Sequence, residues 1–110
     1  MKIDKSLMAG STTLLVLSLL RKEEMYGYQM ITELARRSDQ TFQLKEGTLY
    51  PILHILEADG LVTVREREAE GKRIRKYYRL TRKGLRALEE KKEAFALFTE
   101  KVNAVVQGAT

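Results

Sequence analysis

The side chains with the clearest chemistry in this chain are the cations of one short segment. Seven of the twelve residues from Lys72 to Lys83 are lysine or arginine, and none of the twelve is acidic. Ammonium and guanidinium groups at this density favour a polyanionic partner, above all the phosphate backbone of a nucleic acid. If the charge is considered alone, the alternative to such a partner is a basic surface that is only solvated by water.

The excess positive charge is concentrated around this segment. Residues 45–84 carry ten Lys/Arg against six Asp/Glu, whereas residues 1–44 carry six against five and residues 85–110 carry four of each. The net charge of +5 over 110 residues therefore comes almost entirely from the middle of the chain. Such a distribution is typical of a small domain with one nucleic-acid-binding face.

The sequence offers little support for a catalytic site or a metal site. The chain has one histidine, His54, and no cysteine, and it contains neither a phosphate-binding loop nor a Gly-x-Gly-x-x-Gly motif. His54 could pair with Glu57 or Asp59 as acid and base, but no nucleophile accompanies them. One imidazole without a thiolate does not support a metal site. We therefore expect no enzyme activity, no metal and no cofactor.

Periodic apolar residues predict two helices in the first third of the chain. Residues 11–22 are so densely apolar that we expect this helix in the middle of the domain or beneath a second subunit. Residues 27–37 show the spacing of one buried helix face. The apolar stretch 7–20 is interrupted by Gly10 and by hydroxyl residues, and charged residues follow it, so it resembles neither a signal peptide nor a membrane span. We expect a cytoplasmic protein.

A third helix is predicted over residues 47–59, and Gly60 supplies its stop. Its core stripe consists of Leu49, Ile52, Leu53 and Leu56. Because proline is tolerated in a first turn, Pro51 favours a start near Thr48, whose hydroxyl can cap the helix. A start at Glu46 would instead cost one backbone hydrogen bond at Pro51 and should bend the helix.

Residues 61–67 and 73–80 are predicted to form two strands joined across residues 69–72. In the second strand, alternation separates Arg73, Arg75, Tyr77 and Arg79 from Ile74, Lys76, Tyr78 and Leu80. We expect the second set to lie on the core and the arginines to point outward.

Thr81 is the expected N-cap of a last helix that runs to about residue 107. The apolar stripe of this helix has little left in its own domain to pack against, so a symmetric dimer is the simplest way to bury it. Packing back onto its own domain is the alternative. The expected interface residues are Leu14, Leu88, Phe95, Phe98 and Val102.

The order helix–helix–helix–strand–strand–helix predicts a mainly α fold with a small β-hairpin, namely a winged helix-turn-helix plus a C-terminal dimerisation helix. Residues 1–81 would form the winged helix-turn-helix DNA-binding region and residues 82–110 the dimerisation helix, within one compact domain.

In such a fold the third helix reads base edges and the hairpin, or wing, contacts the flanking backbone or the minor groove. Three residues have an alternative role: Tyr50 could pack under the wing, His54 could be an ordinary exposed histidine, and Tyr77 could be a strand aromatic that covers its neighbours. The expected DNA-binding residues are Lys45, Thr48, Tyr50, Pro51, His54, Lys72, Arg73 and Arg75.

The segments Tyr26-Gly-Tyr-Gln29, Gly47-Thr-Leu-Tyr-Pro51 and Lys76-Tyr-Tyr-Arg-Leu-Thr81, followed by Gly84, resemble the signature of PadR-type transcriptional regulators. The single helix after the wing is similar to the compact branch of that family. The resemblance implies a homodimer that binds a palindromic DNA operator and represses transcription. Lys45 departs from the pattern, because such regulators often carry a small capping residue there.

The resemblance also implies a ligand site, since drug-sensing members of the family stack an aromatic residue on a flat ligand at the dimer centre. Phe95 falls at the position that looks equivalent, and Phe98 could line the same space or fill it. The chain has no tryptophan, so the strongest stacking surface is missing.

The leading hypothesis is thus a dimeric DNA-binding repressor, with a small aromatic ligand as a candidate inducer. The alternatives are a winged-helix protein-interaction module without DNA binding and a small-molecule carrier dimer. The basic segment argues against both, because neither function needs seven cations within twelve residues.

Overall fold

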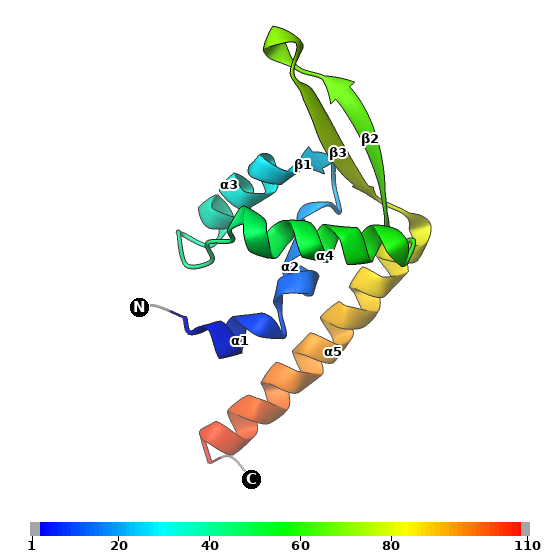
Figure 1. The fold of residues 1–110 in the computed structure, drawn as a ribbon. Coiled ribbons are helices and arrows are strands. Elements are labelled where there is room, and N and C mark those ends of the chain that lie inside the picture. Colours follow the sequence, from blue (N-terminus) through cyan, green and yellow to red (C-terminus); the bar gives the residue numbers. More distant parts are fainter. Residues whose placement is uncertain (1–2, 109–110) are drawn as a thin grey trace.

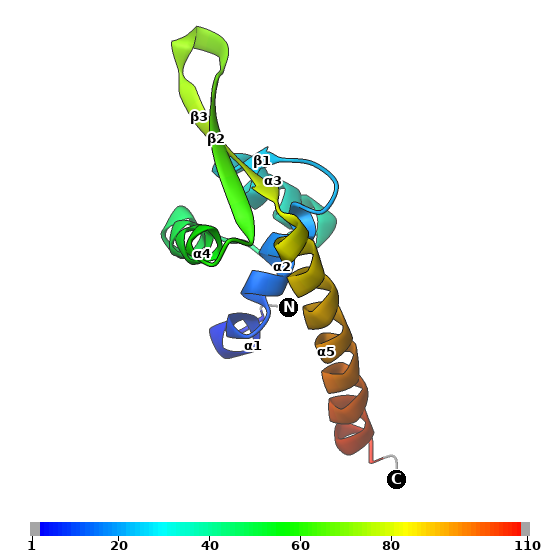
Figure 2. The same cartoon turned by 90° about the vertical axis from the view of Figure 1, so that its right-hand side faces the viewer.

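A computed structural model describes residues 3–108, in which helices and one small sheet build the fold (Figure 1). The helices within residues 5–58 form a helical head in the middle of the molecule. The hairpin and the last helix project from this head in opposite directions (Figures 1 and 2). The elements in chain order are α1 Lys5–Ala9, α2 Thr12–Leu19, β1 Met25–Tyr26, α3 Gly27–Arg37, α4 Glu46–Ala58, β2 Val62–Glu68, the 3₁₀ turn η1 Glu70–Lys72, β3 Ile74–Leu80 and α5 Arg82–Val106.

The N-terminal helix predicted over residues 11–22 is shorter than expected and has a small helix before it. The Asp4 carboxylate caps α1, accepting hydrogen bonds from the backbone N–H groups of Ser6 and Leu7 at 3.1 and 3.2 Å. After α2 the charged residues 21–23 are exposed, and the chain enters the strand β1 instead of a simple connection. The helix ends early because a further turn would carry these charges toward the core.

Helix α4 begins at Glu46, so the earlier of the two predicted starts is correct and Thr48 is not the cap. Lys45 occupies the N-cap position, and no side chain caps the helix. Pro51 is therefore the sixth helical residue, and it cannot donate the hydrogen bond that its position assigns to the Gly47 carbonyl. Gly60 follows the helix with φ at 75°, in the left-handed region, so the predicted stop is confirmed.

The sheet has three antiparallel strands in the order β1-β3-β2 within the described residues, one more than the hairpin that was predicted. β2 and β3 pair along their whole length, from Val62 with Leu80 to Glu68 with Ile74. β1 adds two pairs, Met25 with Tyr78 and Tyr26 with Tyr77. This short third strand ties the base of the wing to the start of α3.

One half of the wing follows the predicted faces and the other half does not. Tyr78 is buried in the core and Leu80 packs against it, as alternation predicts. Ile74 lies on the same face, yet it is 64% exposed. The hairpin extends beyond the helical head (Figure 1), so the core reaches only the lower residues of each strand.

The core lies between α2, α3, α4, the base of the sheet and the first turns of α5. Its completely covered side chains include Leu17, Met30, Leu49, Leu53 and Leu88. Thr81 caps α5 as predicted, its hydroxyl oxygen accepting a hydrogen bond from the Gly84 backbone N–H at 2.9 Å. Beyond Leu88 the helix runs away from the head (Figure 2), and most of its side chains are exposed.

Candidate nucleic-acid interface

The exposed face of α4 presents the first group of predicted contact residues. Lys45, Thr48, Pro51 and His54 are all exposed. Leu49, Leu53 and Leu56 hold the opposite face in the core, which fixes the orientation of the helix. Ile55 is also on the outside and 60% exposed, an apolar contact that the apolar periodicity of the helix did not single out.

Tyr50 does not share this outer face. It is half-buried and packs against the core, and its hydroxyl lies so close to Gly27 that a Cβ at position 27 would overlap it. The predicted alternative, a tyrosine packed beneath the wing, therefore describes Tyr50 better than a fully exposed contact does. The absence of a side chain at Gly27 allows α3 and α4 to approach in this way.

A groove of about 640 Å³ joins the start of α3, the start of α4 and strand β3. Tyr50 forms part of its wall, so it contributes to the same surface even though it is half-buried. The other residues that line the groove are Tyr26, Gly27, Tyr28, Glu46, Arg73, Ile74, Arg75 and Lys76. Two predicted contacts, Arg73 and Arg75, thus face the start of α4, whereas His54 lies farther along the helix and does not line the groove.

The wing tip carries two further predicted contacts. Lys72 and Arg73 are exposed where the chain turns between β2 and β3. Gly71 and Lys72 have φ of 74° and 62°, and the glycine adopts this left-handed conformation without strain. The tip therefore presents both side chains to solvent, and Arg73 also lines the groove beside the start of α4.

Glu24, the second residue before Tyr26 of β1, holds two other wing arginines, one from the middle of β2 and one nearer the tip. Its carboxylate accepts hydrogen bonds from Nε and Nη2 of Arg65 at 3.0 and 2.6 Å, and from Nη1 of Arg67 at 3.2 Å. The hydrogen bonds from Arg65 lower the pKa of Glu24 below its ordinary value. Two of the wing cations are thus already paired within the protein.

Two guanidinium groups lie on tyrosine rings beside this ion pair. Arg67 lies 4.1 Å from the centre of the Tyr77 ring, and Arg75 lies 4.3 Å from the centre of the Tyr26 ring. The two rings meet edge to face, with centres 5.4 Å apart. Tyr77 is therefore a buried strand aromatic, and the hydrogen bond from Arg67 lowers the pKa of its phenol.

Several residues of this surface were not predicted. Tyr28 is 65% exposed at the first turn of α3, and Glu46 lies in the groove among cations. Glu24 and Tyr26 organise the wing, but their partners are about 40 to 50 residues away in the chain. Of these residues, only Tyr28, the second aromatic residue of the Tyr-Gly-Tyr motif, could have been suspected from the sequence.

The predicted dimer residues fall into two groups. Leu88 is 0% exposed within one chain, so it belongs to the core and the prediction that it meets a second subunit is wrong. It packs inward because the first turns of α5 still cover α2. Leu14 is half-buried, whereas Phe95, Phe98 and Val102 are exposed on the projecting part of α5.

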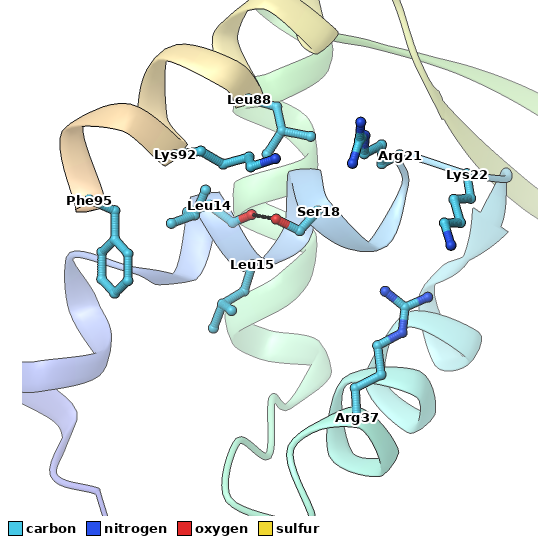
Figure 3. Close-up of a pocket in the computed structure, with 9 residues that line it drawn as sticks. All are labelled: Leu14, Leu15, Ser18, Arg21, Lys22, Arg37, Leu88, Lys92 and Phe95. Carbon is cyan, nitrogen blue, oxygen red and sulfur yellow. Dashed lines mark hydrogen bonds between the residues drawn. The ribbon is translucent and has the colours of Figure 1, made fainter. Parts of the chain in front are cut away.

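Two hollows flank the predicted ligand residues. One, of about 450 Å³, lies between α2, the end of α3 and α5, with Phe95 at one end (Figure 3). The other, of about 520 Å³, lies between α1 and α5 and is lined by both Phe95 and Phe98. Phe95 therefore lines both hollows, whereas Phe98 lines only the second.

Residues 3–108 contain neither a candidate metal site nor a membrane-spanning helix. This part of the chain holds no cluster of three or more histidine, cysteine or acidic side chains suited to a metal ion. Within the same residues, each helix is too short or too polar to cross a bilayer.

Residues 16–90 match the Transcriptional regulator PadR-like family, and the chain belongs to that family. The resemblance inferred from the motifs is confirmed. Because the members of this family are transcriptional regulators, the expectation that the chain is not an enzyme is confirmed as well.

Two regulators illustrate the similarity in sequence. Transcriptional regulator YqjI of Escherichia coli is 30% identical over 100 residues, a match that covers 91% of this chain and 46% of YqjI. This chain thus spans about half the length of that relative. Transcriptional regulator Rv3488 of Mycobacterium tuberculosis is 42% identical over 71 residues, covering 64% of this chain and 63% of Rv3488.

Solved structures show the same fold. A transcriptional regulator from Clostridium thermocellum superposes with a TM-score of 0.84 at 29% identity, covering 92% of this chain and 95% of its own. PadR of Bacillus subtilis, in complex with operator DNA, gives a TM-score of 0.66 at 30% identity over 72% of this chain and 46% of its own. The predicted fold class, a winged helix-turn-helix with mainly α structure, is confirmed.

Proposed function

We propose that this regulator binds double-stranded DNA through α4 and the wing, and that it does so as a homodimer that represses transcription from a palindromic operator. The observation that carries the proposal is the groove in which the start of α4 faces Arg73, Arg75 and Lys76 of the wing. A recognition helix beside a cationic hairpin can enter a major groove while the hairpin meets flanking phosphates. The complex of Bacillus subtilis PadR with operator DNA supports this assignment.

Within the proposed interface, the residues divide by chemistry. Thr48 and His54 can exchange hydrogen bonds with base edges, and Pro51 offers apolar contact to a thymine methyl group. Lys45, Lys72 and Arg73 are suited to phosphates, which supply affinity without sequence preference. Tyr50 and Arg75 are partly buried, so they would shape the groove as well as touch DNA.

The dimer is proposed from the exposed apolar side chains of α5. Phe98 and Val102 project from the part of the helix that has left the head, and Leu97 and Val105 are also exposed there. Burying such side chains against a second copy is favourable, at roughly 25 cal/mol per Å² of apolar surface. A two-fold axis would then place two α4 helices for two half-sites about one helical turn apart.

Release from DNA by a small ligand is the last part of the proposal. The hollows beside Phe95 lie next to the proposed dimer seam, where a bound molecule would change how the two copies are oriented. A ligand can act in this way only if it binds the DNA-competent and the released arrangements with different affinity.

A gel shift with the DNA upstream of the protein's own gene tests the proposal. We expect a discrete complex at moderate salt that survives excess random DNA, together with a dimer in sedimentation experiments. Binding to a partner protein in the absence of any DNA complex would point to the interaction-module alternative instead. Equal affinity for promoter and random DNA would contradict the operator.

A further inference from the structure

Two arginines face each other across the hairpin that projects from the head (Figure 1). Arg67 of β2 and Arg75 of β3 are direct partners in the antiparallel register. Like charges that lie directly opposite one another destabilise a sheet, so this pair has an energetic cost. Glu24 neutralises one of the two, because its carboxylate accepts a hydrogen bond from Arg67 at 3.2 Å. Arg75 forms no ion pair with any residue from 3 to 108.

An aromatic ring holds Arg75 where an acid holds Arg67. The guanidinium carbon of Arg75 lies 4.3 Å from the centre of the Tyr26 ring. The Tyr26 ring is itself fixed, because it meets the Tyr77 ring edge to face and the two residues pair in the sheet. A ring attracts a guanidinium through its face, so it neither neutralises the charge nor occupies the N–H donors at the edge. Arg75 is therefore held in place while it remains charged.

The guanidinium is held where the wing faces the recognition helix. Tyr26 and Arg75 both line the groove of about 640 Å³ that joins α3, α4 and β3, whereas Arg67 lines a separate hollow with Glu24. If α4 enters a major groove and the wing meets the neighbouring minor groove, the DNA strand between the two grooves must pass the surface between α4 and the wing. The groups that this strand presents to the protein are its phosphates.

We propose that Tyr26 is a positioning residue, which presents the N–H edge of Arg75 to one DNA phosphate between α4 and the wing. This inference rests on the proposed function and adds to it a contact that is independent of base sequence. An arginine fork matches the geometry of a phosphate, and a side chain that is already held loses less freedom on binding. Tyr26 acts through Arg75 and contributes no contact of its own to the DNA.

The charges around the groove make the position of Arg75 important. Three of the nine lining residues are cations, and Glu46 at the start of α4 is the one acid among them. Glu46 forms no ion pair with any other residue in the range 3–108, so its carboxylate would repel a phosphate nearby. A guanidinium fixed on a ring can bind the phosphate at a defined place in spite of this acid.

A double-mutant cycle on random-sequence DNA, measured by fluorescence anisotropy at one salt concentration, tests the proposal. Arg75→Ala should weaken binding about ten-fold or more, because it removes a charge-assisted hydrogen bond. Tyr26→Leu should weaken binding about two- to five-fold, because the charge stays but the ring is lost. Tyr26→Phe keeps the ring and should bind as the unsubstituted chain does.

The coupling between the two residues is the deciding quantity. In a chain that already carries Arg75→Ala, Tyr26→Leu should have no further effect on binding. An equal effect of Tyr26→Leu with and without Arg75 would overturn the proposal, as would a loss of binding in Tyr26→Phe. Unfolding temperatures are measured for every variant, and Tyr26→Met replaces Tyr26→Leu in the cycle if the leucine variant does not fold.

Arg67→Ala provides the matched control, because Arg67 also lies on a tyrosine ring, 4.1 Å from the centre of Tyr77, but does not line the groove. In a chain that carries Arg67→Ala, Tyr26→Leu should still weaken DNA binding by the same factor as in the unsubstituted chain. Loss of that effect would mean that Tyr26 supports the wing as a whole, and the specific link to Arg75 would be wrong.

Nuclear magnetic resonance of the protein without DNA examines the contact between ring and guanidinium by itself. Protons above an aromatic face are shielded, so the Nε–H resonance of Arg75 should lie upfield of that of Arg73, which is exposed at the tip. Similar shifts for the two arginines would overturn the proposal. A chain that binds DNA but shows no coupling in the cycle retains the proposed function and loses this inference. A chain with the shielded resonance that binds no DNA loses both.

Discussion

The guanidinium of Arg75 lies over the ring of Tyr26, 4.3 Å from its centre. One face of the arginine is therefore occupied by an aromatic ring, while its N–H edge remains available to an anion. The neighbouring pair of Arg67 with Tyr77, together with Glu24, completes a set of contacts that hold the wing to β1. The wing cations are consequently of two kinds, those fixed within the protein and those free at the tip.

This division predicts different salt dependences for two arginine variants. Arg73→Ala should lower the slope of log K against log salt by about 0.9, the value for one phosphate contact, on any DNA. Arg65→Ala should change the slope much less, because Glu24 already neutralises Arg65. Fluorescence anisotropy with random DNA at several salt concentrations measures both slopes. Equal slopes for the two variants would show that Arg65 leaves Glu24 to reach the phosphates.

Thr48→Ala should act on sequence choice. Thr48 is exposed on α4, so loss of its hydroxyl should cost about 1–3 kcal/mol of binding to the operator, with little change on random DNA. The ratio of operator to random affinity is the quantity to compare, with Arg73→Ala as the matched variant that should leave the ratio nearly constant. An unchanged ratio for Thr48→Ala would remove this residue from the proposed base contacts.

Phe98→Glu should separate the proposed dimer into folded monomers. Phe98 is 65% exposed on α5, so a charge there does not disturb the core of one chain but would oppose burial against a second. Sedimentation equilibrium should give a monomer with an unchanged circular dichroism spectrum. Ile55→Glu is the control, because Ile55 is 60% exposed on α4 and should leave the oligomeric state as it is. A dimer in both variants would place the interface elsewhere.

Acid should weaken the ion pairs at the end of α3. Hydrogen bonds from Arg36 and Arg37 lower the pKa of Glu33 from 4.5 to about 2. Because the folded-state pKa is the lower one, the stability from this group is complete above about pH 4.5 and is lost as the pH falls toward 2. The difference in unfolding free energy between the unsubstituted chain and Glu33→Gln, from urea titrations, should therefore shrink over that range.

A second substitution on the surface of α5 provides the control for the Glu33→Gln measurement. Glu93 lies on α5 and makes no ion pair with the other residues between 3 and 108, so Glu93→Gln should show no comparable acid dependence. A Glu33→Gln difference that stays constant down to pH 2 would contradict the lowered pKa.

Two glycines should respond in opposite directions to alanine. A Cβ at Gly84 would overlap the carbonyl oxygen of Leu61, which is backbone and cannot easily move. Gly84→Ala should lower the unfolding free energy by about 1–3 kcal/mol. Gly47 has open space around it within α4, so Gly47→Ala should raise the unfolding free energy by about 0.5–1 kcal/mol. Thermal and urea unfolding measure both, and a neutral Gly84→Ala would disprove the close approach.

The helix ends that were predicted correctly are marked by strong local signals in the sequence. Thr81 and the periodic residues after it define the start of α5, and Gly60 defines the end of α4. The start of α4 was misjudged because the presence of Pro51 favoured a later first turn. Packing of Leu49 and Leu53 in the core outweighs the bond lost at this proline.

Other features depend on contacts that no local pattern encodes. A two-residue strand such as β1 has no periodicity, and the pair of Glu24 with Arg65 joins residues 41 apart in the chain. Leu88 was misassigned for a related reason. It shares a helical stripe with Phe95, but the core covers α5 only as far as its first turns, so identical spacing leads to burial at one position and exposure at the other.

Pro51 leaves the Gly47 carbonyl without its usual helical donor near the exposed start of α4. An alanine scan of α4 therefore changes a main-chain acceptor at one position, because Pro51→Ala restores an N–H that can bond to the Gly47 carbonyl. A loss of DNA binding in that variant would combine the missing proline ring with the missing acceptor.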